Sequence, residues 1–418
     1  MHFENSLSFA RERDTMDPLR SYRDRFHLPR RPNGEPFIYF CGNSLGLQPK
    51  SVSSYIATEL EDWANLGVEG HFHARNPWMP YHEFLTASTA RLVGANPEEV
   101  VVMNSLSVNL HLMMASFYRP DSGRFKILIE ADAFPSDIYA VESQIRFHGY
   151  NPKDALIKLR PREGEYCLRT EDIEKEIGRA GEWLSLVLMG GVNYYTGQAF
   201  DMERITAAGH EAGAFVGFDL AHAAGNLELK LHDWEVDFAC WCSYKYLNSG
   251  PGGVGGCFIH KNHFRDRSMP RLAGWWGHNK ETRFKMGPDF QPIPTAEGWQ
   301  LSNAPVLAMA SLRASMEIFD EAGIPALREK SRQLTDYLEF VLADAENFGI
   351  KIITPSNPQE RGCQLSLLTG HNGRELFDRI TQEGVICDWR EPNVIRLAPV
   401  PLYNTFEEVW HFARLLLR

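Results

Sequence analysis

The chain has 418 residues, of which 44% are hydrophobic and 23% are charged. This composition indicates a soluble globular protein that is too long for one ordinary hydrophobic core, so we expect two domains. The formal net charge of −11 and the lack of a basic patch in the sequence argue against a nucleic-acid-binding protein, which needs a positively charged surface. The most apolar window, Leu184 to Val192, is too short to cross a bilayer.

The start of the chain and its cysteines bear on cellular location. The first 25 residues carry many charges and no apolar stretch, so we expect no secretory signal. The seven cysteines are scattered and odd in number, which is typical of reduced thiols in a cytoplasmic protein. Because the sequence contains no CxxC pair and no cluster of histidine and cysteine, we predict no metal site.

The N-terminal part of the chain predicts two helices and a strand. A charged surface helix is expected from Phe9 to Leu28, a short strand from Phe37 to Cys41, and a second helix from about Ser51 to Leu66. The segment from Gly67 to Pro80 is polar and aromatic, so it either covers a pocket or is an ordinary surface loop.

Strands and helices alternate after this segment, which is typical of an α/β fold. A strand from Val100 to Met103 is followed by a turn from Asn104 to Ser107 and by a helix from Val108 to Tyr118. The backbone N–H groups and the Ser107 hydroxyl at the start of this helix favour a bound phosphate, although Asn and Ser are also ordinary helix caps.

Two further strands lead to residues that a flat ligand can contact. The strand from Lys126 to Glu130 leads to Phe134, whose ring either stacks on a ligand or belongs to the core, and then to a helix that ends near His148. The strand from Leu184 to Met189 reaches the segment Gly190 to Gly197, where small residues let a ligand approach the backbone.

An aspartate and a lysine each follow a short apolar strand. Asp219 ends the run from Ala214, and Lys245 lies 26 residues later, just beyond a strand that includes Trp241, so both can lie at one edge of a parallel sheet. Aromatic and cysteine neighbours leave little water around Lys245, and desolvation favours the free amine, which can form a Schiff base. The alternatives are a strand-end lysine that reaches solvent and an aspartate that caps a helix.

Together these two residues suit pyridoxal 5′-phosphate (PLP). The lysine can bind the aldehyde carbon, and the aspartate can keep the ring nitrogen protonated so that the ring accepts the electrons of a carbanion. His222 follows Asp219 by one helical turn, where it can orient the aspartate or contact the cofactor.

The segment from Gly250 to Gly255 matches the GxGxxG pattern of dinucleotide-binding proteins. That pattern requires a following helix, whereas here it leads into the strand-like segment Cys257 to His260. We therefore reject an NAD site and predict a tight turn behind Lys245.

The C-terminal third predicts a separate α+β domain after a proline-rich loop region that begins beyond Arg265. Its expected elements are helices Pro305–Ala322 and Ala326–Phe348, strands Lys351–Thr354 and Gly362–Leu368, helix Gly373–Glu383, strands near Val385 and Val394, and a helix from Phe406. We expect residues 47–300 to form the large domain, and 1–46 with 301–418 to form the small one. Arg396 lies in one of these strands, where an arginine suits bidentate binding of a substrate carboxylate.

The chain resembles the kynureninases, which are fold-type I PLP enzymes similar to class V aminotransferases. The resemblance covers nearly the whole chain, and its most specific segments are Phe134–Asp137, Gly217–Ala223, Asp237–Asn248 and Arg361–Leu365. It implies a large domain with a mostly parallel seven-stranded sheet, a smaller α+β domain, and a homodimer with shared active sites.

Carried over residue by residue, the resemblance implies a cofactor site and a substrate site. Lys245 would bind the cofactor covalently, and Asp219 would pair with the ring nitrogen. Tyr244, which the resemblance places at the phosphate, is also our candidate proton donor because it lies beside the lysine, so these three are the candidate catalytic residues. The set implied for the cofactor is Leu106, Ser107, Phe134, Pro135, Ser136, Asp137, Gly190, Asp219, His222, Tyr244, Lys245, Trp275 and Asn303, and the set implied for the substrate is His71, Trp276, Asn303 and Arg396.

Two details of this comparison concern single positions. Trp275 and Asn303 correspond to positions that reach across the dimer interface in the family. Gly190 departs from animal members, which carry serine there, so we expect no side-chain hydrogen bond from this position.

The implied reaction is the hydrolytic cleavage of the Cβ–Cγ bond of L-kynurenine or 3-hydroxykynurenine. The products are anthranilate or 3-hydroxyanthranilate and L-alanine, which places the reaction in tryptophan catabolism and the NAD-forming kynurenine pathway. One alternative is another enzyme of this fold, such as a class V aminotransferase or a cysteine desulfurase, which needs a cysteine on a mobile loop. A second alternative is an inactive binding protein, which predicts the loss of Lys245 or Asp219, yet both are present.

Overall fold

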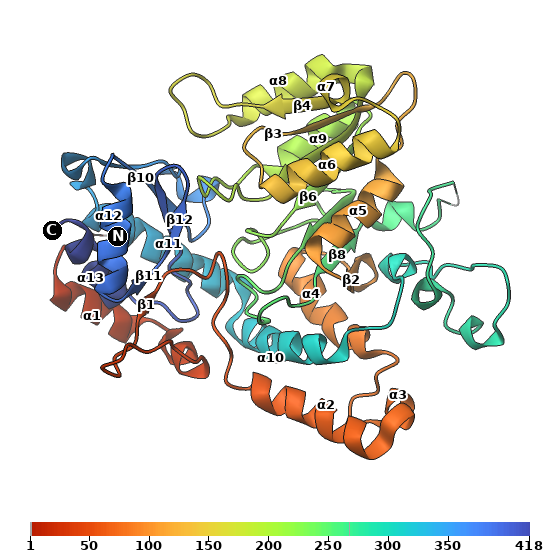
Figure 1. Ribbon diagram of the computed structural model, residues 1–418, viewed down its shortest axis with the longest axis horizontal. Coiled ribbons are helices and arrows are strands. Elements are labelled where there is room, and N and C mark those ends of the chain that lie inside the picture. Colours follow the sequence, from red (N-terminus) through yellow and green to blue (C-terminus); the bar gives the residue numbers. More distant parts are fainter. Residues whose placement is uncertain (1, 267) are drawn as a thin grey trace.

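A computed structural model describes residues 2–266 and 268–418. Two lobes lie side by side (Figure 1): a larger lobe around a seven-stranded sheet and a smaller lobe around a four-stranded sheet. Both ends of the chain lie in the smaller lobe. Within the described residues, no helix combines the length and the apolar character that a membrane span needs.

The large sheet has the strand order β2-β8-β7-β6-β5-β3-β4. Its strands are β2 (Val100–Val102), β3 (Lys126–Glu130), β4 (Leu156–Leu159), β5 (Leu184–Gly190), β6 (Phe215–Asp219), β7 (Phe238–Trp241) and β8 (Gly256–Ile259). All run in the same direction except β8, which is antiparallel to both of its neighbours. The predicted α/β fold with a mostly parallel seven-stranded sheet is therefore confirmed.

Helices cover both faces of this sheet, because successive residues of a strand point to opposite sides. The helices of the large lobe are α2 (Val52–Leu66), α3 (Gly70–His73), α4 (Thr86–Val93), α5 (Leu106–Phe117), α6 (Pro135–Phe147), α7 (Pro152–Ala155), α8 (Thr170–Ala180), α9 (Met202–Glu211) and α10 (Val306–Ala322). Val101 and Ile129 share one core with α5 and α6. Val100 and Leu128 share the other core with α4, α8, α9 and α10. The sheet is thus buried on both sides, and its carboxyl edge is left for a ligand.

The smaller lobe has its own hydrophobic core. Its antiparallel sheet has the order β12-β13-β10-β9, and the N-terminal β1 pairs with β11. The elements are α1 (Leu7–Met16), β1 (Ile38–Tyr39), α11 (Ile324–Val341), β9 (Ile350–Ile352), β10 (Leu365–Thr369), α12 (Gly373–Gln382), β11 (Val385–Ile386), β12 (Asp388–Arg390), β13 (Val394–Leu397) and α13 (Phe406–Leu416). The N-terminal segment therefore completes this lobe. The predicted division of the chain at residues 47 and 300 stays a prediction. Helix α10 lies beyond residue 300 in the sequence, yet it packs on α2 of the large lobe.

The predicted helix from Phe9 to Leu28 is wrong in its extent. Helix α1 ends at Met16, and a 3-10 helix from Arg20 to Arg25 follows. Pro18 disfavours the helical conformation at Asp17, whose ψ of 116° is extended. The Asp17 carboxylate then accepts the Leu19 N–H at 2.8 Å, which fixes the turn between the two helices.

Other boundaries differ by smaller amounts. The segment from Gly67 to Pro80, predicted as a loop, contains the short helix α3. The helix predicted to end at Phe348 stops at Val341, and strand β12 was not predicted. The glycine-rich run does lead into strand β8 rather than a helix, as predicted.

Candidate active site

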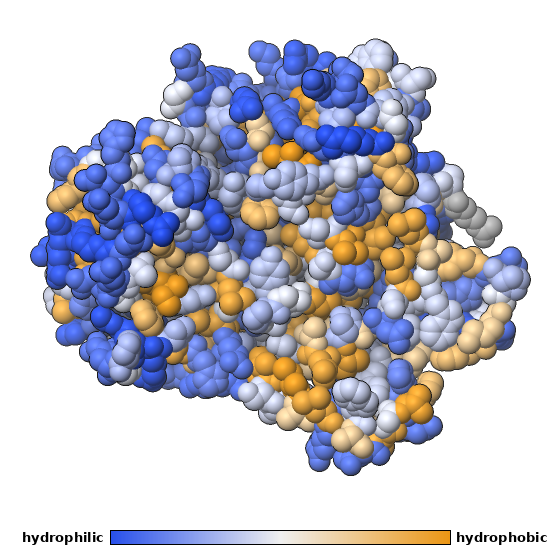
Figure 2. All heavy atoms as spheres, in the orientation of Figure 1, coloured by the Kyte–Doolittle hydropathy of each residue, from blue (hydrophilic) through white to orange (hydrophobic). Residues whose placement is uncertain are grey.

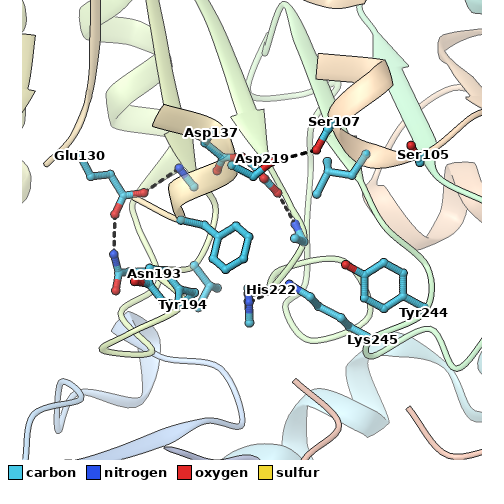
Figure 3. A pocket seen from close by; sticks show the side chains of 16 residues that line it. Ser105, Ser107, Glu130, Asp137, Asn193, Tyr194, Asp219, His222, Tyr244 and Lys245 are labelled. Carbon is cyan, nitrogen blue, oxygen red and sulfur yellow. Dashed lines mark hydrogen bonds between the residues drawn. The ribbon is translucent and has the colours of Figure 1, made fainter. Parts of the chain in front are cut away.

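A cavity of about 160 Å³ lies at the carboxyl edge of the large sheet, where β3, β5, β6 and β7 end (Figure 3). It is lined by Ser105, Leu106, Ser107, Glu130, Phe134, Ser136, Asp137, Gly190, Val192, Asn193, Tyr194, Asp219, Ala221, His222, Tyr244 and Lys245. The topology explains why residues far apart in the chain meet here, because parallel strands place their carboxyl ends at one edge.

Lys245 lies in the loop after β7 and points into the cavity (Figure 3). Its Nζ lies 3.0 Å from His222 Nε2 and 5.8 Å from the centre of the Phe134 ring. The loop is held by the N-terminal segment, since the Gly46 N–H donates to the Tyr244 carbonyl at 2.9 Å. A Cβ at Gly46 would lie 2.3 Å from the Lys245 carbonyl oxygen, so only glycine allows this approach.

The glycine-rich run packs between the lysine loop and the start of α5. A Cβ at Gly255 would lie 3.0 Å from the Trp241 carbonyl oxygen and 3.2 Å from the backbone of Ser105. The run is therefore a structural support behind the pocket, as predicted, and Gly255 sets how closely the turn before α5 approaches β7.

Two buried carboxyl groups, Asp219 and Asp137, face each other in the cavity. Asp219 accepts the Ala221 N–H at 2.7 Å, which fixes its orientation. Burial and the mutual repulsion of the two carboxyls raise the pKa of Asp137 well above its usual value. Burial also raises the pKa of Asp219, despite the Ala221 N–H and the nearby Lys245 ammonium. The pair is therefore short of positive charge and suits a ligand that brings a cationic N–H.

His222 lies between this pair and the small lobe. Burial and the charge of Lys245 lower the pKa of His222 well below its usual value, so the imidazole is neutral. Its Nε2 is positioned to accept a hydrogen bond from the Lys245 ammonium, and its Nδ1 is buried without a partner among the described residues. An unpaired buried nitrogen in a cavity wall is costly unless a ligand contacts it.

Two helix N-termini meet at the other end of the cavity. Helix α5 begins at Leu106 and α6 begins at Pro135, and the Ser107 and Ser136 hydroxyls lie 3.0 Å apart. Helix N-termini carry unpaired N–H groups and partial positive charge, which together favour a phosphate. Tyr244 also lines the cavity, and burial raises the pKa of its hydroxyl, which keeps it protonated.

Sequence reasoning missed two polar residues of the pocket wall, Glu130 and Asn193. Glu130 is the last residue of β3, and its two oxygens accept hydrogen bonds from the Gly190 N–H at 2.9 Å and from Asn193 Nδ2 at 2.7 Å. Burial raises the pKa of Glu130 to about 7. A strand-end acid beside a glycine-rich turn is the signal that could have identified it.

The structure places Arg396 beside the cavity but does not leave it free. Its guanidinium donates to the Tyr194 carbonyl at 2.7 Å and to the Ser44 hydroxyl at 3.2 Å, and it pairs with Asp388. It is 1% exposed, and burial lowers its pKa. Tyr194 lines the cavity, and its ring contacts both the Arg396 guanidinium and the Phe134 ring.

Six predicted residues do not line the cavity of this chain: His71, Pro135, Trp275, Trp276, Asn303 and Arg396. His71 is in α3, where its Nδ1 lies 3.0 Å from the Val68 carbonyl oxygen. Trp276 is buried under Arg283, while Trp275 is 41% exposed and Asn303 is exposed.

A cluster that could hold a metal ion lies outside the cavity, formed by Glu99, His232 and His260. The Glu99 carboxylate already accepts the Lys261 N–H at 3.1 Å and lies 2.9 Å from His232 Nδ1. The two imidazole rings stack at 5.1 Å with an interplanar angle of 8°. Stacked parallel rings do not direct their nitrogens at one common point, so hydrogen bonding accounts for this group.

Comparisons with known proteins decide the family. Residues 327–416 match the family model of the kynureninase C-terminal domain. Kynureninases from Koribacter versatilis and Myxococcus xanthus are each 59% identical to this chain over 412 and 414 residues, which covers 99% of this chain and 97% of either relative. The chain belongs to the kynureninase family.

Solved structures share the fold of this kynureninase-family chain at low identity. An apo cysteine desulfurase from Thermococcus onnurineus has a TM-score of 0.74 at 19% identity and covers 91% of this chain and 94% of its own. A variant of the cystine C–S lyase C-DES, with glycine linked covalently to its PLP cofactor, has a TM-score of 0.77 at 17% identity and covers 94% and 98%. These likenesses confirm the predicted fold-type I class.

Proposed function

We propose that the chain is a PLP-dependent hydrolase that cleaves the Cβ–Cγ bond of L-kynurenine or 3-hydroxykynurenine to give the corresponding anthranilate and L-alanine. The observation that carries this proposal is that Lys245 and Asp219 share one cavity, at opposite sides of a space that begins at two helix N-termini. The family of the chain supplies the reaction.

The residues present fit the cofactor. Asp219 and Asp137 would hold the protonated ring nitrogen, because two carboxyl groups that share one cavity, with pKa values raised by burial, favour a cationic N–H beside them. The N-termini of α5 and α6, with Ser107 and Ser136, would hold the phosphate. Leu106, Phe134, Gly190 and Tyr244 would complete the walls, with Pro135 next to Phe134 at the start of α6. When bound, PLP supplies an electron sink and a carbonyl carbon that takes up the substrate amine.

The remaining chemistry falls to side chains of this chain. The Lys245 amine, once released by the substrate, is the general base for the Cα proton. Neutral His222 accepts a hydrogen bond from Lys245 and so holds the Nζ atom towards the cavity. Tyr244 keeps its proton and is our candidate donor to the carbon that leaves as alanine.

Arg396 would bind the substrate carboxylate beside Tyr194. In this chain the Arg396 guanidinium already forms an ion pair with Asp388. The substrate carboxylate would therefore bind the guanidinium together with Asp388, or replace its hydrogen bond to Ser44. His71, Trp276 and Asn303 would face the aromatic end of the substrate.

We further propose that two chains form a homodimer with shared active sites. Hydrophobic residues reach the surface over α2 and α3 at the bottom of the view in Figure 2. The exposed Phe72 of α3 contacts Phe284, which contacts Trp275, so these aromatic rings form one surface cluster. An exposed aromatic cluster favours burial against another protein surface. We propose that this surface is a second copy of the chain, which receives Trp275 and Asn303 beside its cavity. Sedimentation of wild type and of Phe284→Glu tests this, and a monomeric wild type would contradict it.

A cytoplasmic location and a role in tryptophan catabolism belong to the same proposal. All seven cysteines carry free thiols, including the buried Cys240 and Cys257, whose sulfurs lie 3.6 Å apart. Thiols this close without a bond fit a reducing compartment.

The cysteines also argue against the desulfurase alternative. Burial raises the pKa of Cys363 to about 12 and those of Cys41 and Cys167 to about 11. None of the seven thiols is on an exposed residue. A sulfur acceptor needs an accessible thiolate, which none of these provides.

Release of fluorescent anthranilate from kynurenine by the purified, PLP-loaded protein tests the proposed reaction. We expect turnover with kynurenine or its 3-hydroxy form and none with cysteine as sulfur donor. Absence of turnover with both kynurenines would contradict the proposal.

A further inference from the structure

Glu130 is a buried carboxyl group with two hydrogen-bond donors and no cationic partner. It is 3% exposed, and in the described part of the chain it forms no salt bridge. One oxygen accepts the Gly190 N–H at 2.9 Å, and the other accepts Asn193 Nδ2 at 2.7 Å. A carboxylate supplies two acceptors for these two donors, whereas an amide supplies only one. The need for two acceptors explains why an acid occupies position 130, even though burial and the charge of Asp219 raise the pKa of Glu130 to about 7.

Asn193 connects Glu130 to the turn that follows β5. Its Oδ1 accepts the Tyr195 N–H at 3.0 Å, the Thr196 N–H at 2.9 Å and the Thr196 hydroxyl at 3.1 Å. The side chain of Asn193 therefore holds the turn with its oxygen and Glu130 with its nitrogen, so its orientation is fixed by both ends.

The other side of the same turn is held by the small lobe. The Tyr194 carbonyl accepts from Arg396 Nη1 at 2.7 Å and from Gln364 Nε2 at 3.0 Å. The Tyr195 carbonyl accepts the Ser366 hydroxyl at 2.6 Å. A continuous path thus runs from the end of β3 to the guanidinium of β13, and Figure 3 shows its first three members, Glu130, Asn193 and Tyr194.

Gly190 makes room for this arrangement. A Cβ at this position would lie 2.8 Å from Glu130 Oε1, so the carboxylate occupies the space that a side chain would need. Gly190 also pairs with Asp219 in the β5–β6 register, and the Gly191 N–H donates to the Asp219 carbonyl at 2.7 Å. Glu130 therefore fixes the strand beside Asp219 as well as the turn.

We propose that Glu130 is a positioning residue that acts through Asn193 and the turn 193–197 to orient Arg396 and Tyr194 at the substrate end of the cavity. The inference rests on the proposed function only where it assigns Arg396 to the substrate carboxylate. Glu130 itself exchanges no proton with the substrate in this role. Its loss changes how the substrate is bound more than how fast the bound substrate reacts.

Glu130→Gln tests the anchor, because the new amide turns a donor towards one of two existing donors. An unsatisfied buried donor costs about tenfold in binding. We expect KM for kynurenine to rise about tenfold while kcat and the affinity for PLP, measured by titration of the absorbance, stay within about threefold. A fall in kcat with unchanged KM would overturn the proposal.

A reciprocal exchange provides the matched control. Asn193→Asp places two carboxyls opposite each other, whereas Glu130→Gln with Asn193→Asp restores both hydrogen bonds with donor and acceptor exchanged. We expect the double variant to recover KM to within about threefold of wild type. Recovery is not complete, because the weak contact from Asn193 Nδ2 to the Asp132 carbonyl at 3.3 Å is lost. A double variant no better than Asn193→Asp alone would contradict the exchange.

Two further measurements separate this inference from the proposed function. The first is thermal unfolding of the cofactor-free proteins. We expect Glu130→Gln to raise the unfolding midpoint when it is added to Asn193→Asp by much more than when it is added to wild type. Additive changes in the midpoint would refute the coupling between the two residues. In kinetics, Glu130→Gln combined with Arg396→Lys is expected to raise KM by less than the product of the single changes, and a full product would show that Glu130 does not act through Arg396. If wild type fails to turn over kynurenine, the proposed function fails while the unfolding experiment still decides the anchor.

Discussion

Asp219 and Asp237 are buried aspartates at opposite ends of two neighbouring strands: Asp219 is the last residue of β6, and Asp237 directly precedes β7. Asp237 precedes β7 and receives hydrogen bonds from the Val216 N–H at 2.7 Å, from His263 at 2.7 Å and from His210 at 2.9 Å. Burial alone would raise the pKa of Asp237, but the two histidines outweigh it and hold the pKa below its usual value. Asp219 has the Ala221 N–H and a second carboxyl instead, and its pKa is raised.

The different partners of Asp237 and Asp219 show where this fold leaves buried charge uncompensated. At the amino edge every oxygen of Asp237 has a donor, so the carboxylate ties β6 and β7 to nearby loops. At the carboxyl edge Asp219 and Asp137 form no salt bridge with a described residue, and the nearby Lys245 does not offset the effect of burial on their pKa values, which is a feature of ligand sites rather than of structural ion pairs.

Replacement of Lys245 should have the largest effect on the ligand edge. Lys245→Ala removes the amine that holds the cofactor and takes the Cα proton, so we expect the visible absorbance of the bound cofactor to disappear. Turnover should fall by about 10³-fold or more. Lys261→Ala, which changes an exposed lysine at the other edge, is the control and should leave both signals unchanged. A retained cofactor absorbance in Lys245→Ala would show that the lysine is misassigned.

The two aspartates should respond in opposite directions when the cofactor is absent. Asp237→Asn breaks a buried charge network and should lower the free energy of unfolding by on the order of 3 kcal/mol. Asp219→Asn removes one of two repelling carboxyls and should raise it, while it lowers turnover of the loaded enzyme. Chemical denaturation of the cofactor-free proteins measures both, and a loss of stability in Asp219→Asn would contradict the contrast.

Two glycines behind the pocket should differ in what they affect. Gly255→Ala forces contacts at 3.0 to 3.2 Å with Trp241, Asn109 and Ser105, so we expect the start of α5 to shift and the affinity for PLP to fall. Gly252→Ala has open space around its Cβ but a φ of +67°, so it should cost about 1 kcal/mol of stability without a change in affinity. Equal PLP affinities of the two variants would argue against close packing at Gly255.

The pH dependence of stability should show the two edges separately. Raised pKa values at Asp137, Asp219 and Glu130 mean that the folded cofactor-free protein keeps protons that the unfolded chain releases, so its free energy of unfolding should fall as the pH rises from about 4 to about 7. The raised pKa of His210 has the same sign at higher pH, because its contribution is complete below about 6.5 and is lost as the pH rises through the folded value.

The lowered pKa of Asp237 has the opposite sign. Its contribution is present above the usual aspartate pKa and is lost as the pH falls through the lowered value. In Asp237→Asn the thermal midpoint should therefore fall less as the pH drops below the usual aspartate pKa, and in Asp219→Asn it should fall less as the pH rises above that value. A pH profile unchanged by either substitution would remove the electrostatic basis of the comparison.

Most of the sheet could be predicted from the sequence. β3 was predicted with its observed bounds, and β5 and β6 within one residue, because buried parallel strands form continuous apolar runs between turn residues. In the smaller sheet, the edge strand β12 was missed. Its residues Asp388 to Arg390 are polar, and they are extended because they pair with β13. The early end of α1 was missed although Pro18 signalled it.

The sequence alone was enough to place Asp219 at the end of a strand and Lys245 in the turn after the next strand, because alternating apolar runs and turn residues predict where parallel strands end. It could not determine that Asn193 donates to Glu130 or that Arg396 donates to the Tyr194 carbonyl, since the first pair joins segments 63 residues apart and the second joins the two lobes. Only the tertiary structure decided which buried charges find a partner. Hydrogen bonds between distant segments depend on how two cores pack, and no local pattern of residues encodes that distance.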